Sequence, residues 1–162
     1  MSPDHDSAMQ EALELARRAE EQGEVPVGAV VIAPDGRVIG RGYNRRETDN
    51  DPLAHAEVMA IREATRALGS WRLNDCTLVV TLEPCPMCLA ACQQTRLAQV
   101  IYGARDPKGG AISLEYTLHQ DKRLNHRFEA VFRETPECGG ILTRFFRRKR
   151  DGSGAPKPEQ KG

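Results

Sequence analysis

Hydrophobic and polar positions follow two different periods in the N-terminal part of the chain. Apolar side chains recur at helical spacing over residues 7–22, which predicts an amphipathic helix capped by Asp6 or Ser7. The continuous apolar run over 27–32 predicts a buried strand, and residues 38–43 predict a second strand. Because turn-forming residues separate the two strands, we expect them to pair as a β-hairpin.

Helical and extended patterns alternate through the rest of the chain, after a polar loop over 44–52. Residues 55–68 predict a helix, and its apolar face consists of Val58, Ile61, Ala64, Thr65 and Leu68. The segments that follow are predicted to be a strand at 77–82, a helix at 85–97, strands at 100–102 and 128–132, and a helix at 136–148. This alternation predicts an α/β protein in which helices cover a sheet.

The length of 162 residues suits one domain, which we place at residues 1–150. Residues 151–162 are rich in Gly, Ser and Pro, which predicts a disordered tail. The N-terminus is polar and resembles no signal peptide, and no apolar run approaches the length of a membrane span. We therefore expect a cytoplasmic protein with no membrane contact, whose five cysteines are free thiols.

The 23 basic and 23 acidic residues cancel, so net charge predicts neither nucleic-acid nor membrane binding. The distribution of charge is more informative, because residues 144–150 read Arg-Phe-Phe-Arg-Arg-Lys-Arg. Such a cluster can bind a phosphate backbone, although it is more often a solvated helix end.

One histidine and two cysteines have the spacing of metal ligands. His55 begins one predicted helix, and Cys85 and Cys88 begin another, where the helix dipole favours thiolate over thiol. Imidazole and thiolates suit zinc, and three protein ligands leave a fourth position for a bound water or hydroxide. Glu57 would then be free to carry protons beside the ion.

Each of these residues also has a simpler interpretation. Cys85 and Cys88 alone could form a redox pair or half of a structural zinc site. His55 could be a surface residue and Glu57 a partner of the helix dipole. Cys92 lies one turn after Cys88 and could close the zinc site as a fourth ligand, but a ligand inside the helix would point away from its start. Cys76 and Cys138 are expected to be buried apolar residues.

The chain resembles the bacterial tRNA-specific adenosine deaminases of the cytidine and deoxycytidylate deaminase superfamily. The spacing H-x-E followed by P-C-x-x-C is the signature of zinc nucleobase deaminases. The residues that carry the resemblance are 24–30, 42–45, 51–57, 81–88, 103–108, 124–127 and the final helix ending at 144–147.

The resemblance implies a three-layer α/β/α fold of the cytidine-deaminase type, in which helices flank a central mixed sheet of about five strands. It also implies a homodimer with one zinc ion per subunit, held by His55, Cys85 and Cys88. Glu57 would be the catalytic residue that shuttles protons. The reaction would convert adenosine to inosine at the wobble position of a tRNA anticodon.

The resemblance further implies contacts to the anticodon stem-loop. Asn44 would hydrogen-bond the adenine, and Val27 would line its pocket. Asp106 and Lys108 lie on a loop that touches RNA in this family. Phe145 or Phe146, with Arg147, would close over the anticodon loop, where splayed bases can stack on aromatic rings.

Two other functions stay open at this point. The first is a deaminase of a free base or nucleoside of the guanine or cytosine type, which would not need the basic C-terminal residues. The second is a zinc-stabilised binding module without turnover, in which Glu57 would have no chemical role.

Overall fold

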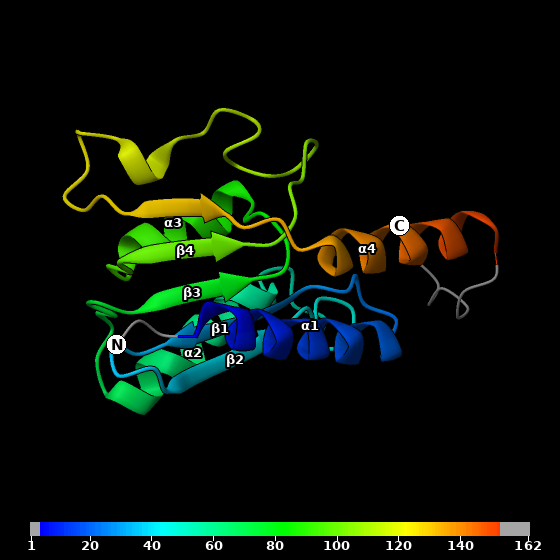
Figure 1. Ribbon diagram of the computed structural model, residues 1–162, viewed down its shortest axis with the longest axis horizontal. Coiled ribbons are helices and arrows are strands. Elements are labelled where there is room, and N and C mark those ends of the chain that lie inside the picture. The colour runs from blue at the N-terminus through cyan, green and yellow to red at the C-terminus, as the bar shows by residue number, and fades with distance from the viewer. Residues whose placement is uncertain (1–3, 153–162) are drawn as a thin grey trace.

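The structure, a computed structural model, describes residues 4–152 as a five-stranded sheet with helices on both faces (Figure 1). The elements are α1 (His5–Glu21), β1 (Gly28–Ile32), β2 (Val38–Tyr43), α2 (Ala56–Leu68), β3 (Thr77–Val80), α3 (Pro86–Gln94), β4 (Gln99–Tyr102), a 3₁₀ turn η1 (Leu118–Gln120), β5 (Glu129–Phe132) and α4 (Pro136–Arg150). Apart from its first two residues, the predicted tail at 151–162 lies outside the described residues.

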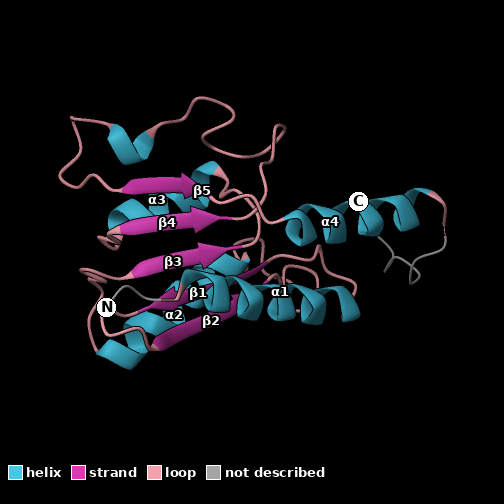
Figure 2. Cartoon of the chain, viewed as in Figure 1, coloured by secondary structure: helices cyan, strands magenta, loops and turns pink. Residues whose placement is uncertain are grey.

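The sheet is mixed, as predicted, with the strand order β2-β1-β3-β4-β5. Strand β1 is antiparallel to both of its neighbours, whereas β3, β4 and β5 are parallel to one another. Strands β2, β3, β4 and β5 therefore all end at one edge of the sheet, the edge to which the arrows point in Figure 2. Because α2, α3 and α4 follow strands that end there, this carboxyl edge is where an open sheet places a site.

Two apolar cores, one on each face of the sheet, establish the three layers. Helix α1 packs with Cys138 of α4 against alternate strand residues such as Val30, Val79 and Ile101. Helices α2 and α3 pack on the opposite face, against the intervening residues of the same strands. The period-two alternation of a strand thus gives each side of the sheet its own core, as the three-layer prediction requires.

Every predicted helix and strand is present, but several boundaries differ. The N-cap of α1 is Asp4, whose carboxylate accepts the Ser7 N–H at 3.0 Å, and not Asp6 or Ser7. Helix α3 ends at Gln94, three residues before the predicted end. The chain turns there because Arg96 adopts a positive φ of 65°, which allows Leu97 to fold back and be buried. The turn η1 was not predicted, because three residues are too short to show a period.

The buried face of α2 differs from the predicted face. Its buried residues include the small side chains Ala56, Ala60 and Ala64, while Leu68 is 41% exposed. The cause lies in β2, where Gly40 and Gly42 let the helix backbone approach the strand. A Cβ at position 42 would lie 2.3 Å from the Ala56 carbonyl oxygen, so the close contact selects a glycine on the strand and alanines on the helix.

We predict that Gly42→Ala pushes the start of α2 away from the sheet and lowers the free energy of unfolding by about 1–3 kcal/mol, the usual cost of overpacking. Thermal and denaturant unfolding measure this change. Gly139→Ala in α4 is the matched control, because a Cβ there meets nothing within 4 Å and alanine favours a helix. Equal stability of the two variants would contradict the close α2–β2 contact.

Candidate metal centre and substrate cleft

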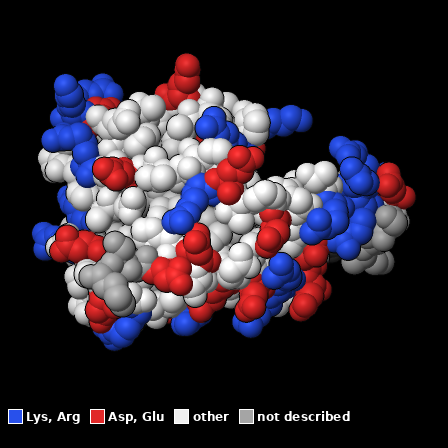
Figure 3. Space-filling view, viewed as in Figure 1, with Lys and Arg blue, Asp and Glu red and all other residues white. Residues whose placement is uncertain are grey.

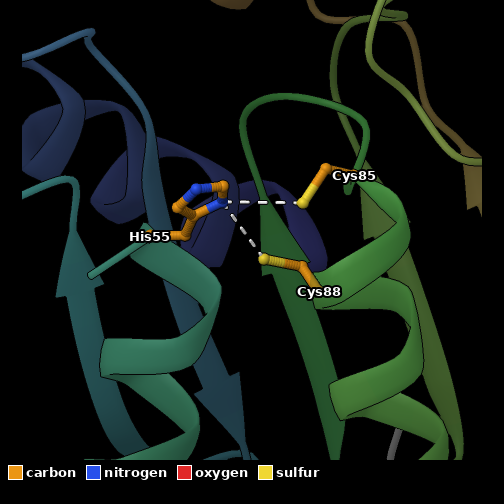
Figure 4. A group of neighbouring side chains, drawn as sticks. All are labelled: His55, Cys85 and Cys88. Carbon is orange, nitrogen blue, oxygen red and sulfur yellow. Dashed lines mark hydrogen bonds between the residues drawn. The ribbon is translucent and has the colours of Figure 1, made fainter. Parts of the chain in front are cut away.

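Three potential metal ligands meet where the N-termini of α2 and α3 lie side by side (Figure 4). The Nδ1 atom of His55 lies 3.6 Å from the Cys85 Sγ atom and 3.4 Å from the Cys88 Sγ atom. His55 follows the loop after β2, and both cysteines follow β3, so the strand order brings together residues about thirty positions apart.

The start of each helix fixes the ligand that belongs to it. His55 and Cys85 are the N-cap residues, and their carbonyl oxygens accept the first helical hydrogen bonds, at 3.0 and 2.9 Å. Pro86 occupies the first helical position of α3, where its missing N–H has no cost. The ligands therefore lie on backbone whose conformation is set by helix geometry.

The ionisation of the two thiols is unequal in the metal-free arrangement. The hydrogen bond from the Cys88 thiol, assisted by His55, lowers the pKa of Cys85 to about 4. Cys88 donates that hydrogen bond and is fully buried, so its own pKa is raised. Cys85 is therefore ready to bind as a thiolate, and binding of a cation at this place must release the proton of Cys88.

The donor set fits zinc. His55, Cys85 and Cys88 form a group whose ligand atoms all lie within 4.8 Å of one another. It is the group of His, Cys, Asp and Glu side chains within residues 4–152 that could hold a metal ion. One imidazole and two thiolates are a common set for a catalytic zinc ion with one open position. Cys92 is not in this group; it is buried in the α2–α3 core and leaves that position free.

Glu57 lies in the first turn of α2, directly beside the ligands. Its side chain is 4% exposed, and burial raises the pKa of its carboxyl group to about 7. A carboxyl group with a pKa near neutrality can both accept and return a proton at physiological pH. This pKa supports the proton-carrying role predicted for Glu57.

A cleft of about 270 Å³ gives access to the ligands. Seven of the residues singled out from the sequence or the resemblance line it, and these are Val27, Asn44, His55, Glu57, Cys85, Asp106 and Phe145. A larger hollow of about 520 Å³ lies along β5 and contains none of them. The cleft that His55 and Cys85 line is therefore the candidate substrate site.

Four other residues named by the resemblance lie outside the cleft lining, and one of them is the fully buried Cys88. Lys108, Phe146 and Arg147 are exposed, and Phe146 is exposed to 47%. Phe145 is the aromatic residue that faces the cleft, and the ammonium nitrogen of Lys149 lies 5.1 Å from the centre of its ring. Phe145 thus lies at the cleft and Phe146 on the surface, and the contact of either residue with RNA stays a prediction.

Asn44 has a structural role that the sequence did not indicate. Its Oδ1 atom accepts the Ala56 N–H at 2.8 Å, and its Nδ2 atom donates to the Val25 carbonyl at 3.1 Å. The side chain thus caps α2 beside His55 and ties this helix to the chain before β1. One N–H of the amide remains for a ligand in the cleft.

The cleft also contains residues that sequence reasoning did not assign, above all the buried carboxylates Glu24 and Glu83. No periodicity could reveal them, because a buried glutamate at a strand end looks like a surface glutamate in the sequence. Lys149 was noticed only as part of the basic run at 144–150. Its position over the cleft follows from the direction of α4 past the carboxyl edge (Figure 1).

Comparison with known proteins places the chain in a family. The model of the cytidine and deoxycytidylate deaminase zinc-binding region matches residues 2–104. A tRNA-specific adenosine deaminase of Bacillus subtilis is 50% identical over 143 residues, with 88% of each chain covered. The chain therefore belongs to the cytidine and deoxycytidylate deaminase family, and the matched region is described as zinc-binding.

Solved structures agree with this assignment. A structure from a study of A-to-I editing by tRNA:A34 deaminases is 44% identical, with a TM-score of 0.76, and covers 80% of this chain and 99% of its own. A guanine deaminase of Bacillus subtilis is 34% identical, with a TM-score of 0.62, and covers 96% of this chain and 98% of its own. The fold is common to both, so it does not by itself separate an RNA substrate from a free base.

We predict that His55→Ala and Cys88→Ala lower both the zinc content and the stability of the protein, because metal binding contributes directly to folding. Metal analysis of the purified protein and thermal unfolding measure the two effects. Cys92→Ala is the matched control: it also removes a buried thiol of α3, but it should retain the metal. Full zinc occupancy in either ligand variant would disprove the assignment.

Proposed function

We propose that this protein removes the amino group of adenosine by hydrolysis at the wobble position of a tRNA anticodon and so forms inosine. The observation that carries the proposal is a set of three ligands, His55, Cys85 and Cys88, that leaves one zinc position open. Two of these ligands line a cleft together with the buried Glu57. The similarity to tRNA-specific adenosine deaminases over 88% of the chain supports the choice of substrate.

The chemistry divides between the metal and Glu57. Zinc, when bound by the three ligands, supplies a Lewis acid that makes water nucleophilic at neutral pH. Glu57 accepts a proton from the attacking water and delivers it to the neighbouring ring nitrogen. It then takes the proton of the hydroxyl group now on C6 and gives it to the departing amino group, so that the carbonyl forms and ammonia leaves. A pKa of about 7 allows the carboxyl group to perform both transfers without a large barrier in either direction.

The walls of the cleft supply groups that suit an adenine ring. Val27 and Phe145 are buried apolar side chains that can pack on the two sides of a flat base. The remaining N–H of Asn44 can donate to a ring nitrogen or a hydroxyl oxygen of the nucleoside. A base can enter only after it is turned out of its stack, which an anticodon loop permits.

The surface beside the cleft suits a phosphate backbone. The last turns of α4 carry Arg147, Arg148, Lys149 and Arg150, and Figure 3 shows basic side chains gathered at that end of the molecule. Arg148 is paired with Glu20 of α1, which holds α4 in place, whereas Arg147 is exposed. Lys108 and Phe146 add an exposed cation and an aromatic ring for RNA contacts.

A second candidate, deamination of guanine or another free base, has the support of the 34% identity to a guanine deaminase. The basic end of α4 favours RNA, because Arg147 and Arg150 are exposed outside the cleft lining, where a small substrate in the cleft would not contact them. A homodimer and a cytoplasmic location remain predictions. Within residues 4–152, no helix is both long and apolar enough to cross a bilayer.

We predict that the zinc-loaded protein converts adenosine to inosine in an anticodon stem-loop with an arginine-type anticodon. Mass spectrometry detects the conversion as a gain of about one mass unit, since an amine becomes a carbonyl. Glu57→Gln should keep its zinc but lose about 10²–10⁴-fold in rate, the usual contribution of general acid–base catalysis. Turnover of guanine with none of the RNA would favour the second candidate, and a Glu57→Gln variant of normal activity would exclude the proposed proton carrier.

We predict that Arg147→Ala weakens RNA binding several-fold and reduces the slope of log affinity against log salt by about one. Arg37→Ala is the control, because Arg37 is an equally exposed arginine in the hairpin turn at the opposite edge of the sheet. Titrations with a labelled stem-loop at several salt concentrations measure both effects. An unchanged slope for Arg147→Ala would show that this end of α4 does not bind RNA.

The predicted dimer has support in exposed apolar residues around the site. Leu53 precedes His55, and Leu114 and Tyr116 belong to the loop that pairs with Pro84; these three side chains are 48%, 42% and 55% exposed. We expect these side chains to belong to the surface that the second chain covers, because an exposed apolar patch is typical of an interface. Sedimentation equilibrium should give twice the chain mass, and Leu114→Lys should shift the protein to monomers.

A further inference from the structure

Two buried carboxylates beside the cleft have no part in the chemistry described so far. The side chains of Glu24 and Glu83 are 2% and 3% exposed, and both line the cleft. Neither forms a salt bridge with a described cation in residues 4–152. Buried negative charge next to a bound polyanion opposes binding, so the presence of both groups requires a structural reason.

Glu83 holds the loop over 106–113. One of its carboxylate oxygens accepts the Asp106 N–H at 3.1 Å and the Ser113 hydroxyl at 2.6 Å. The other oxygen accepts the Ser113 N–H at 2.7 Å. The carboxylate therefore pins both ends of a loop that carries Asp106 and Lys108, which we expect to face the RNA.

The same loop encloses the Glu83 side chain closely. A Cβ at Gly110 would lie 2.2 Å from the Glu83 carboxylate and 2.7 Å from the Asp106 carbonyl, so the turn accepts only glycine. The Ala111 N–H donates to the Pro84 carbonyl at 2.8 Å, which ties the loop to the residue before Cys85. The loop thus has a fixed position relative to the metal ligand.

Glu24 holds the loop on the other side of the cleft with the same chemistry. One oxygen accepts the Glu47 N–H at 3.2 Å, and the other accepts the N–H and the hydroxyl of Thr48, both at 2.6 Å. This loop runs from Asn44 to His55, and it therefore leads directly into the other half of the metal centre.

The sheet places these two carboxylates at the same edge. Glu24 precedes β1 and Glu83 follows β3, and because these strands are antiparallel, the start of one lies beside the end of the other. Glu24 thus fixes the loop that leads into His55, and Glu83, which lies two residues before Cys85, fixes the loop over 106–113. In both cases the partners are backbone N–H groups, which need a hydrogen-bond acceptor.

We propose that Glu24 and Glu83 are paired positioning residues, which fix the two loops of the cleft against the metal centre and so align the RNA without touching it or the reacting atoms. This inference rests on the proposed function for its choice of substrate. Its structural part, the anchoring of the two loops, does not depend on any activity.

Glutamine variants distinguish a positioning role from an effect of charge, because the two predict opposite changes in RNA affinity. In Glu83→Gln the amide nitrogen must face the N–H of either Asp106 or Ser113, so one buried loop N–H loses its acceptor. The same holds for Glu24→Gln and the N–H groups of Glu47 and Thr48. If the carboxylates acted only through their charge, both variants would bind RNA more tightly; positioning requires weaker binding.

The first measurement is steady-state kinetics with the anticodon stem-loop and zinc-loaded protein. Each variant should raise KM by about tenfold, keep kcat within about threefold and retain its zinc, because the interaction lost is one that places the substrate. An unchanged or lowered KM overturns the proposal. So does a loss of zinc, which would make the carboxylates supports of the metal centre and not of the loops.

The second measurement needs no substrate and therefore separates this proposal from the proposed function. Hydrogen exchange followed by mass spectrometry should show faster exchange at 106–113 in Glu83→Gln and at 44–52 in Glu24→Gln, each without an effect on the other loop. Unchanged exchange in both loops overturns the anchoring role even if the wild type is inactive on RNA.

Milder variants keep the test valid if a glutamine variant fails to fold. Ser113→Ala and Thr48→Ala each remove one hydroxyl donor from an exposed residue and leave the carboxylate in place. Each should raise KM a few-fold. Thr65→Ala is the matched control, because its hydroxyl donates to the Arg62 carbonyl on α2, away from the cleft, and KM should not change. Equal effects of all three variants would contradict the proposal.

Discussion

Two helix N-termini meet at one edge of the sheet, and every functional statement about this protein depends on that meeting. The order β2-β1-β3 places the ends of β2 and β3 on either side of β1, so the helices that follow them begin close together. His55 and the two cysteines reach one another only for this reason. The close packing of α2 on the glycines of β2 keeps the first of these helices in place, and Asn44 fixes its first turn.

Three buried glutamates in one cleft show how environment decides what a side chain does. The carboxyl group of Glu57 is buried beside the metal ligands, where desolvation brings its pKa to about 7 and suits it to proton transfer. Glu24 and Glu83 are buried to the same degree, but backbone N–H groups satisfy both oxygens of each. The first group is suited to proton transfer, whereas the other two hold loops because their oxygens accept backbone N–H groups.

Much of this arrangement could be predicted from the sequence, because strong local patterns fix the element types and the metal-ligand spacing is specific. Periodicity located every helix and strand, and the positions of His55, Glu57, Cys85 and Cys88 at helix starts indicated an open zinc site. Sequence patterns could not indicate which face of α2 is buried, because that depends on how closely the helix packs on two glycines of the preceding strand. Nor could they distinguish Glu24 and Glu83 from surface glutamates, since their partners are backbone groups of distant loops.

The central claim is that one nitrogen and two sulfur atoms bind the metal and leave one position for solvent. X-ray absorption at the zinc edge of the metal-loaded protein tests this claim most directly. The account predicts two sulfur ligands at about 2.3 Å and two nitrogen or oxygen ligands at about 2.0–2.1 Å, one of which exchanges with small anions. A third sulfur ligand, or a shell that no added anion changes, would mean a closed structural site and would contradict the account.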